Sequence, residues 1–248
     1  MKEALLRLGL YYKVNDFRFR HEARNSSQKS FYAGFIGPHD LVFDVGANVG
    51  QRAQIFSELG RMVVAVEPQP NCVRHLKSRF KFNPKVVIEN VALSDREGEA
   101  VMWQSDSHDL SSMSRKFIET MSRGAFRDKR WDQEIRVFTK TLDRLIDLYG
   151  QPRWLKIDVE GYELNVLKGL NRPVPFISFE YRPELIDEAR ACVERVNQIS
   201  ADYRYNYCVD EHLDFVLKEH ASYSAFTGRI LPELHKQNTF GDIYAILK

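Results

Sequence analysis

Residues 42–50 constrain the fold of this chain more narrowly than any other segment. An apolar run ends at Asp44, and small or polar residues follow at every second position: Gly46, Asn48 and Gly50. This pattern predicts a buried strand, a tight turn and then a helix. Glycines let the backbone take unusual dihedral angles and let a ligand approach closely, and a helix N-terminus offers free N–H groups. The segment therefore predicts a nucleotide-like ligand at the first strand-to-helix turn of an α/β sheet.

The next strand strengthens the ligand interpretation. An ordinary strand, turn and helix would also use glycines, and Asn48 stands where the dinucleotide fingerprint G-x-G-x-x-G has a glycine. However, a β-rich run at 62–66 ends in Glu67 and Pro68, roughly 20 residues after Asp44. An acidic residue at that place binds ribose hydroxyls in such folds. The two strand ends together predict that Glu67 binds a ribose.

Composition limits the classes of protein to which the chain can belong. With 248 residues, 44% hydrophobic and 28% charged, it is an ordinary globular protein with one sizeable core or two small ones. A net charge of +2 without blocks of like charge predicts neither nucleic acid nor an acidic membrane as partner. Three scattered cysteines without metal spacing predict a reducing, cytoplasmic location. Neither a membrane span nor a signal peptide is expected, because no apolar run approaches about 20 residues.

Strand and helix patterns alternate from residue 41 to about residue 200. Strands are expected at 41–45, 62–67, 85–91, 154–159 and 175–181, and helices at 51–59, 70–80, 141–149, 162–169 and 183–199. Such alternation predicts an α/β fold with a mostly parallel sheet, right-handed crossovers and helices on both faces. Beyond residue 200, the runs 205–209 and 214–217 predict a hairpin and 241–247 another strand. We therefore expect an antiparallel addition at the C-terminal edge of the sheet.

Two segments lie outside this alternation and set the expected domain organisation. Residues 1–40 begin with an amphipathic pattern, which predicts a helical lead-in that caps the sheet or covers the site. Residues 41–248 are expected to form one ligand-binding domain. Within it, residues 103–138 are too long for a simple connection, which predicts a lid or a disordered segment. Their mixed charges fit a solvated helical face as well as contact with a substrate.

Three ionisable residues share one face of the strand predicted at 154–159. Because side chains alternate between the faces of a strand, Lys156, Asp158 and Glu160 point the same way. A central parallel strand is normally apolar on both faces, and burying unpaired charge is costly. Pairing of the lysine with the carboxylates would explain the pattern. Since the fourth strand of a doubly wound sheet lies beside the first, the pattern also predicts that both carboxylates face the turn at 44–50.

With these residues in view, the chain resembles the FkbM-type family of S-adenosylmethionine-dependent methyltransferases. The resemblance covers about residues 40–181 and extends weakly to 241–244. The matching motifs stand at 43–50, 67–68, 90–94 with Gly98, 111–113, 141–143, 155–163 with Leu167 and Gly169, and 180. Their order and spacing together make the resemblance specific. It implies a Rossmann-like class I methyltransferase sheet, mostly parallel, with an antiparallel C-terminal edge strand.

The resemblance also implies roles for the matched residues. Asp44, Gly46, Asn48 and Gly50 would hold the methionine part of S-adenosylmethionine, Glu67 its ribose, Asn90 to Ala92 the border of its adenine, and Asp158 its amino group or methyl. Glu160 and Glu180 would lie on the acceptor side, and Ser111 and Ser112 at the edge of the lid. The family is mostly associated with O-methylation of sugars and secondary metabolites, which implies a hydroxyl on a small-molecule or glycan acceptor.

The chemistry of methyl transfer narrows the catalytic candidates. Transfer from a sulfonium is an in-line displacement, so the protein mainly aligns donor and acceptor. A hydroxyl attacks well only as its proton leaves, which requires a general base or a metal. The candidates for the base are Asp158, Glu160 and His108, and Lys156 would serve only with a lowered pKa. Asp158, Glu160 and Glu180 could together bind Mg²⁺, but we favour a site without a metal.

Three other functions fit the same fold less well. An NAD-dependent oxidoreductase would need a glycine in the middle of the turn, where Asn48 stands. A non-catalytic nucleotide-binding module would not need Asp44, Glu67 and Asp158 together. A nucleic-acid methyltransferase is disfavoured because no Pro-rich base-flipping motif follows the fourth strand and no basic stripe is visible. The sequence therefore predicts a methyltransferase that acts on a small molecule or a glycan.

Overall fold

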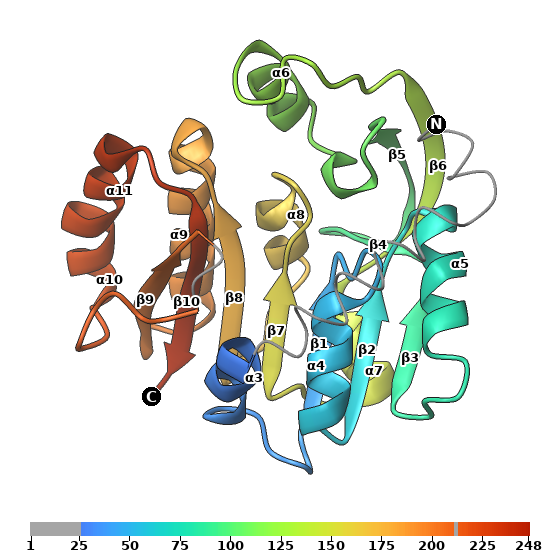
Figure 1. Cartoon of the computed structure of the whole chain (residues 1–248). Helices are drawn as coiled ribbons and strands as arrows, with labels where there is room; N and C mark the ends of the chain where they lie inside the picture. Colours follow the sequence, from blue (N-terminus) through green and yellow to red (C-terminus); the bar gives the residue numbers. More distant parts are fainter. Residues whose placement is uncertain (1–25, 211–212) are drawn as a thin grey trace.

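A seven-stranded sheet runs through the computed structural model, which describes residues 26–210 and 213–248 (Figure 1). The strand order is β3-β2-β1-β7-β8-β10-β9. The strands are β1 (Leu41–Val45), β2 (Met62–Val66), β3 (Val86–Glu89), β7 (Trp154–Ile157), β8 (Phe176–Tyr181), β9 (Tyr203–Val209) and β10 (Gly241–Leu247). The first five pair in parallel, and β10 is antiparallel to both β8 and β9. The expected mostly parallel sheet with an antiparallel C-terminal strand is confirmed, and β9 is the outermost strand beside it.

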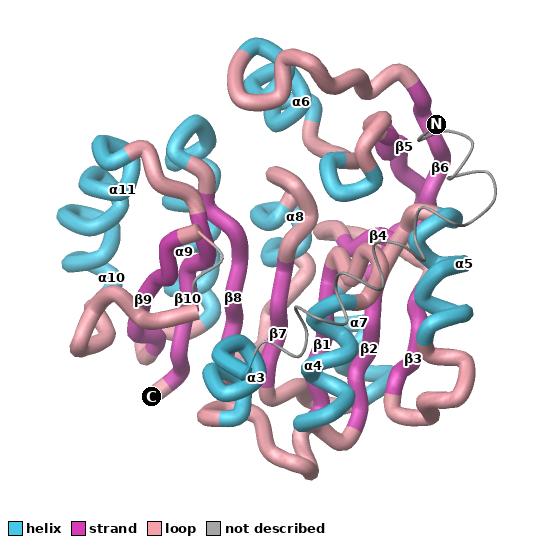
Figure 2. Tube along the Cα trace, viewed as in Figure 1, coloured by secondary structure: helices cyan, strands magenta, loops and turns pink. Residues whose placement is uncertain are grey.

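Helices cover both faces of this sheet, as the alternation predicts (Figure 2). One face carries α3 (Ser26–Ala33), α4 (Gln51–Leu59) and α5 (Pro70–Arg79), and the other carries α7 (Leu142–Tyr149), α8 (Glu163–Lys168), α9 (Ile186–Ile199) and α11 (Leu231–Gln237). The short helix α10 (Tyr223–Ala225) precedes α11. The side chains of β1 alternate between two hydrophobic clusters, with Phe43 in one and Val42 in the other. The core is therefore double, with one half on each side of the sheet.

The hairpin expected from 205–209 and 214–217 is wrong. Residues 205–209 belong to β9, but residues 214–217 form no strand. The reason lies in the buried side chain of Asn206, whose Oδ1 accepts from the Leu217 backbone N–H at 3.0 Å and whose Nδ2 donates to the Leu217 carbonyl at 2.8 Å. A side-chain amide thus takes the place of a regular strand ladder at this position.

The long insertion is an ordered unit beside the main sheet. β4 (Ala92–Leu93), β5 (Gly98–Gln104) and β6 (Gln133–Lys140) form a second sheet in the order β4-β6-β5. A 3-10 turn (His108–Leu110) and α6 (Arg115–Arg123) lie between β5 and β6. Figure 1 shows this unit beyond the carboxyl ends of the central strands. Residues 103–138 therefore run from the end of β5 through α6 into β6, at the end of the sheet where ligands bind in α/β folds.

The described part of the N-terminal lead-in packs into the core. Tyr32, at the end of α3, is buried, and its ring centroid lies 4.8 Å from that of Phe56 and 5.3 Å from that of Trp154. The amphipathic start predicted in residues 1–40 falls in residues 1–25, outside the described residues. Over the part of the chain that the structure describes, every helix is too short or too polar to cross a membrane.

Candidate active site

A cavity of about 290 Å³ opens at the carboxyl ends of β1, β2 and β7. Its wall comes from the turn after β1, the segment after β2, residues 91–93, the end of β7 and a few residues of the insertion, among them Asp109 and Met113. Because β1 pairs with both β2 and β7, this is the topological switch point at which α/β sheets bind ligands. The cavity is near the lower end of the size range of small-molecule sites.

Left-handed backbone shapes the turn after β1. Gly46, Asn48 and Gly50 have φ values of 78°, 50° and 84°. A Cβ on Gly46 would lie 1.8 Å from the carbonyl oxygen of Asp158, so only glycine fits there. Asn48 tolerates the left-handed region better than most residues do. The turn therefore runs close against the loop that follows β7 and still leaves the cavity open.

Asp44 is a buried carboxylate without a hydrogen-bond partner within the described ranges. Neither of its oxygens makes a hydrogen bond of good geometry, although the side chain is 1% exposed; the Ala53 backbone N–H faces it and favours its charged form. Burial raises its pKa, and the positive charge of Lys156 opposes this effect. Because buried polar groups are almost always hydrogen-bonded, an orphaned carboxylate on a cavity wall indicates a ligand that donates hydrogen bonds or carries positive charge.

Glu67 ties the two strand ends together. Its Oε2 accepts from the Asn48 backbone N–H and its Oε1 from the Gln69 backbone N–H, both at 2.9 Å. Burial raises the pKa of Glu67 to about 7. Asn90 does not line the cavity, since its exposed side chain donates to the carbonyls of Glu67 and Pro68 at 3.1 Å and supports this turn from outside. The neighbouring backbone around Ala92 lines the cavity.

The charges at the end of β7 form an ion pair between a buried lysine and a partly exposed aspartate. Lys156 Nζ lies 2.8 Å from Oδ2 of Asp158. Burial by itself would lower the pKa of Lys156. The negative charges of Asp158 and Asp44 outweigh this effect, so the pKa of the lysine is raised. Burial by itself would raise the pKa of Asp158. The positive charge of Lys156 outweighs this effect, so the pKa of that carboxyl is lowered. The lysine therefore stays protonated, which rules it out as a general base.

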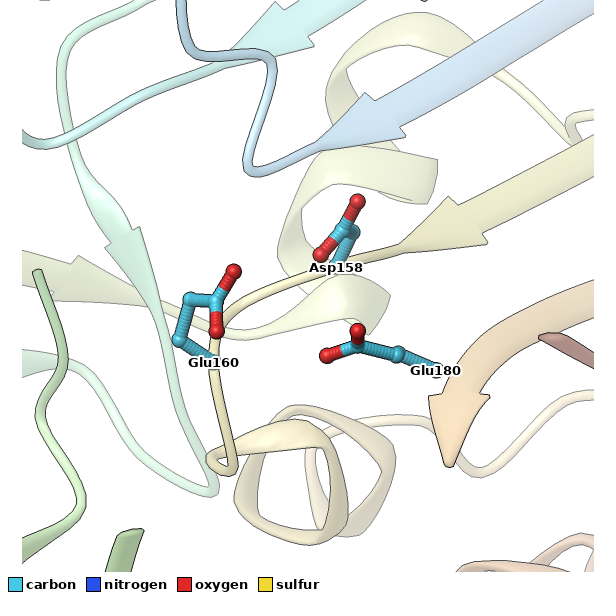
Figure 3. A group of neighbouring side chains, drawn as sticks. All are labelled: Asp158, Glu160 and Glu180. Carbon is cyan, nitrogen blue, oxygen red and sulfur yellow. The ribbon is translucent and has the colours of Figure 1, made fainter. Parts of the chain in front are cut away.

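Two further carboxyls approach Asp158, as Figure 3 shows. Each of Asp158, Glu160 and Glu180 offers an oxygen within 4.8 Å of the other two. Burial raises the pKa of both Glu160 and Glu180. The negative charges of Glu180 and Asp158 raise the pKa of Glu160 further. Oxygen donors suit Mg²⁺, but Lys156 lies 2.8 Å from Asp158 and Arg182 lies 3.0 Å from Glu180. Two side-chain cations thus already balance much of this negative charge.

The remaining predicted residues lie at different depths. Ser111 lines the cavity, whereas Ser112 is fully buried behind it and donates from Oγ to the Glu160 carbonyl at 2.6 Å. Glu180 also lies behind the cavity wall rather than on it. His108 belongs to the 3-10 turn of the insertion, and its side chain falls outside the described part of the structure.

Two charged residues of the site, Arg182 and Asp242, were missed in the sequence. Arg182 pairs with Glu180, and Asp242 of β10 stands opposite Glu180 in the strand register. Glu163 accepts from the backbone N–H groups of Val159 and Gly161, and burial raises its pKa to about 7. Period-two alternation is the signal that could have found Arg182, because it follows Glu180 by two positions.

Comparisons with known proteins bear on the family and the fold of the chain. The chain is 28% identical over 148 residues to the hexuronic acid methyltransferase AglP of Haloferax volcanii, and the match covers 56% of this chain and 54% of that protein. The chain thus spans about half the length of this relative. The crystal structure of methyltransferase FkbM from Methylobacillus flagellatus KT superposes with a TM-score of 0.50 and 14% identity, over 84% of this chain and 43% of the other. The structural likeness confirms the expected class I methyltransferase fold.

The family model settles the family of the chain. The model of the methyltransferase FkbM domain matches residues 44–207, from the end of β1 through most of β9. The match includes the orphaned carboxylate of Asp44, the buried Glu67 and the ion pair at the end of β7. It covers well over half of the sequence. The chain therefore belongs to the FkbM methyltransferase domain family.

Proposed function

We propose that the chain transfers a methyl group from S-adenosylmethionine to a hydroxyl of a sugar or another small molecule. The observation that carries this proposal is the pair of buried carboxyls at adjacent strand ends. Asp44 has two unpartnered oxygens beside the cavity, and Glu67 stands at the tip of the next strand. S-adenosylmethionine carries an ammonium group and a ribose. The ammonium would pair with Asp44, and the ribose hydroxyls would donate to Glu67 at the next strand end.

The remaining cavity wall also fits this cofactor. The two oxygens of Glu67 accept the backbone N–H groups of Asn48 and Gln69 and a side-chain hydrogen bond from Gln69, which leaves one of the four lone pairs of the carboxylate for a ribose hydroxyl. The turn from Gly46 to Gly50 would cradle the methionine part, and the apolar residues Ala92 and Met102 would face the adenine. When bound, the cofactor supplies an electrophilic methyl group. The chain's own residues bind it, orient the acceptor and accept the acceptor's proton.

Glu160 is our candidate for the general base. It lines the cavity, and its raised pKa makes the ionised form a stronger proton acceptor than an ordinary carboxylate. Its φ of 55° is a costly conformation for a residue other than glycine, and such strain is concentrated at functional sites. Asp158 is paired with Lys156 and has a lowered pKa, so it is better suited to orient the acceptor hydroxyl or the cofactor.

A sugar hydroxyl is the acceptor that the comparisons support best. The named relative acts on a hexuronic acid, and its match covers more than half of this chain. We therefore propose O-methylation of a sugar or glycan, with a secondary metabolite as the other acceptor class. The chain's three cysteines are free and buried, which supports the expected cytoplasmic location.

Parallel calorimetric titrations with S-adenosylmethionine, S-adenosylhomocysteine and NAD test the cofactor assignment. We expect both adenosyl ligands to bind, NAD not to bind, and Glu67→Ala to lose the binding. A screen of sugar acceptors then follows, with methyl transfer detected by mass spectrometry. Binding of NAD alone would favour the oxidoreductase, and binding of none of the three would favour a module without this activity.

A further inference from the structure

The guanidinium of Arg182 lies between two glutamates at the acceptor side of the candidate active site. Its Nη2 is 3.0 Å from Oε1 of Glu180, and its Nε donates to Oε2 of the same carboxylate at 3.3 Å. The contact is therefore bidentate, which is the geometry that fixes a carboxylate most firmly. The same Nη2 lies 3.8 Å from Oε2 of Glu160. One cation thus faces both glutamates, and all three side chains are 16% exposed.

Aromatic rings from two parts of the chain surround this guanidinium. Its central carbon lies 6.0, 5.3 and 5.8 Å from the ring centroids of Phe117, Phe126 and Phe240. Phe117 belongs to α6 and Phe126 follows that helix, so the insertion supplies two of the three rings. Contacts between a partly desolvated cation and aromatic rings are attractive. Arg182 therefore connects the insertion to the two glutamates.

The insertion also holds the backbone next to Glu160. Ser112 Oγ donates to the Glu160 carbonyl at 2.6 Å, and a Cβ on Gly161 would lie 2.6 Å from Cβ of Phe117. The left-handed backbone at Glu160 is thus enclosed by the same segment that surrounds Arg182. The insertion therefore holds the backbone of Glu160 directly, whereas the Glu160 carboxylate faces Arg182 at 3.8 Å without a hydrogen bond at Oε2.

We infer that Arg182 is a positioning residue for Glu160: it holds the Glu180 carboxyl, behind the cavity wall, beside the Glu160 carboxyl, which lines the cavity, and makes their geometry depend on the position of α6. This inference rests on the proposed role of Glu160 as the base. Arg182 does not line the cavity, so it acts on the reaction through Glu160 and not by touching the acceptor.

The charges around the glutamate pair define the expected pH dependence. The charged groups that face the pair are Asp158 with its partner Lys156, Glu163 on α8, Asp242 on β10, Arg182, and Glu188 on α9 with its partner Lys116. Burial raises the pKa of both glutamates, like charges add to this effect, and Arg182 opposes it. Without the guanidinium, the pKa of both glutamates rises, so the basic form is reached only at higher pH.

The test compares Arg182→Met, which removes the charge, with Arg182→Lys, which keeps the charge and loses the bidentate fork. In protein labelled with ¹³C at the glutamate carboxyls, we expect Arg182→Met to move the titration of the pair to higher pH by about one unit or more. Glu160→Gln and Glu180→Gln assign the signals. In a plot of kcat against pH, the acid limb of Arg182→Met should move in the same direction. Arg182→Lys should leave the acid limb in place and lower kcat about tenfold or more.

Arg190→Met is the matched control, because Arg190 is a partly buried arginine that donates to the Thr227 carbonyl away from the cavity. It should leave the titration and the acid limb unchanged. Wild-type titration in Arg182→Met, or wild-type kcat in folded Arg182→Lys, would overturn the inference. The carboxyl titration needs no turnover. Absence of methyl transfer in the wild type, together with a shifted titration in Arg182→Met, would therefore refute the proposed function and leave Arg182 as the residue that holds the pair.

Discussion

The carbonyl oxygen of Asp158 lies where a side chain on Gly46 would have to be, since a Cβ there would be only 1.8 Å away. These two residues belong to loops more than a hundred positions apart in the sequence, one after β1 and the other after β7. Their contact brings the turn that would hold the cofactor against the loop that carries the candidate base. The side of the cavity that we propose for the cofactor and the side that we propose for the acceptor therefore form one continuous wall.

We expect Gly46→Ala to disrupt this wall. The new methyl group would overlap the Asp158 carbonyl, and the φ of 78° is unfavourable for alanine. The loss of unfolding free energy should be about 3 kcal/mol, or the loop should shift and abolish binding of S-adenosylhomocysteine. Urea unfolding and calorimetry measure the two effects. Gly228→Ala is the control, because nothing lies within 4 Å of the place that its new methyl group would take, and it should be neutral or slightly stabilising.

The affinity for the cofactor should rise with pH up to about pH 7. Burial raises the pKa of Glu67 to about 7 in the free protein, and ribose hydroxyls donate best to the ionised carboxylate. Binding therefore releases a proton below that pH, and each unit further down should weaken affinity by up to about tenfold. Calorimetry across pH, in buffers of different ionisation enthalpy, measures this. Glu67→Gln should flatten the dependence, and Glu58→Gln should not change it.

Two ion pairs of nearly equal length should differ widely in their contribution to stability. Lys156 and Asp158 are 2.8 Å apart with the lysine buried, and Lys29 and Glu58 are 2.7 Å apart at the surface. Lys156→Met leaves the buried Asp44 carboxylate, as well as Asp158, without its cation and should cost about 3 kcal/mol of unfolding free energy. Lys29→Met should cost less than about 1 kcal/mol. Equal losses in urea unfolding would contradict the ion-pair assignment.

Replacing the candidate base should affect turnover and not cofactor binding. Glu160→Gln keeps the shape of the side chain and removes the proton acceptor, so kcat should fall by about 10²- to 10⁴-fold. The dissociation constant of S-adenosylhomocysteine should remain near the wild-type value. Glu58→Gln, which alters the exposed pair with Lys29 away from the cavity, should leave kcat unchanged. If Glu160→Gln turns over normally, the base lies elsewhere, and Asp158 and His108 become the candidates.

Methyl transfer should not require a divalent cation. Lys156 and Arg182 already lie against the carboxyls of Asp158, Glu160 and Glu180, so the site has its own positive charge. Dialysis against a chelator should therefore leave kcat unchanged. A loss of activity that Mg²⁺ restores would instead assign these three carboxyls to a metal.

Much of the sheet and the cofactor side could be predicted, because local patterns specify them. The expected strands and helices between residues 41 and 200 are present, and each strand of the parallel sheet has its own apolar run. The fully buried run before Asp44 and the β-rich run before Glu67 could be found in short windows of sequence. The strand expected at 214–217 is absent because the side chain of Asn206 forms hydrogen bonds with the backbone of Leu217. No local pattern within 214–217 could indicate this contact.

The sequence alone determined the class of fold, the turn between Asp44 and Gly50, and the place of Glu67, since these depend on residues close together in the chain. Only the tertiary structure decided that Arg182 lies against Glu160 and Glu180, and that α6 surrounds it with Phe117. The ionisation of these groups follows from burial and from neighbours on separate elements, and neither is written in any one segment. The physical reason is that charge interactions depend on distance in space, which the folded sheet sets.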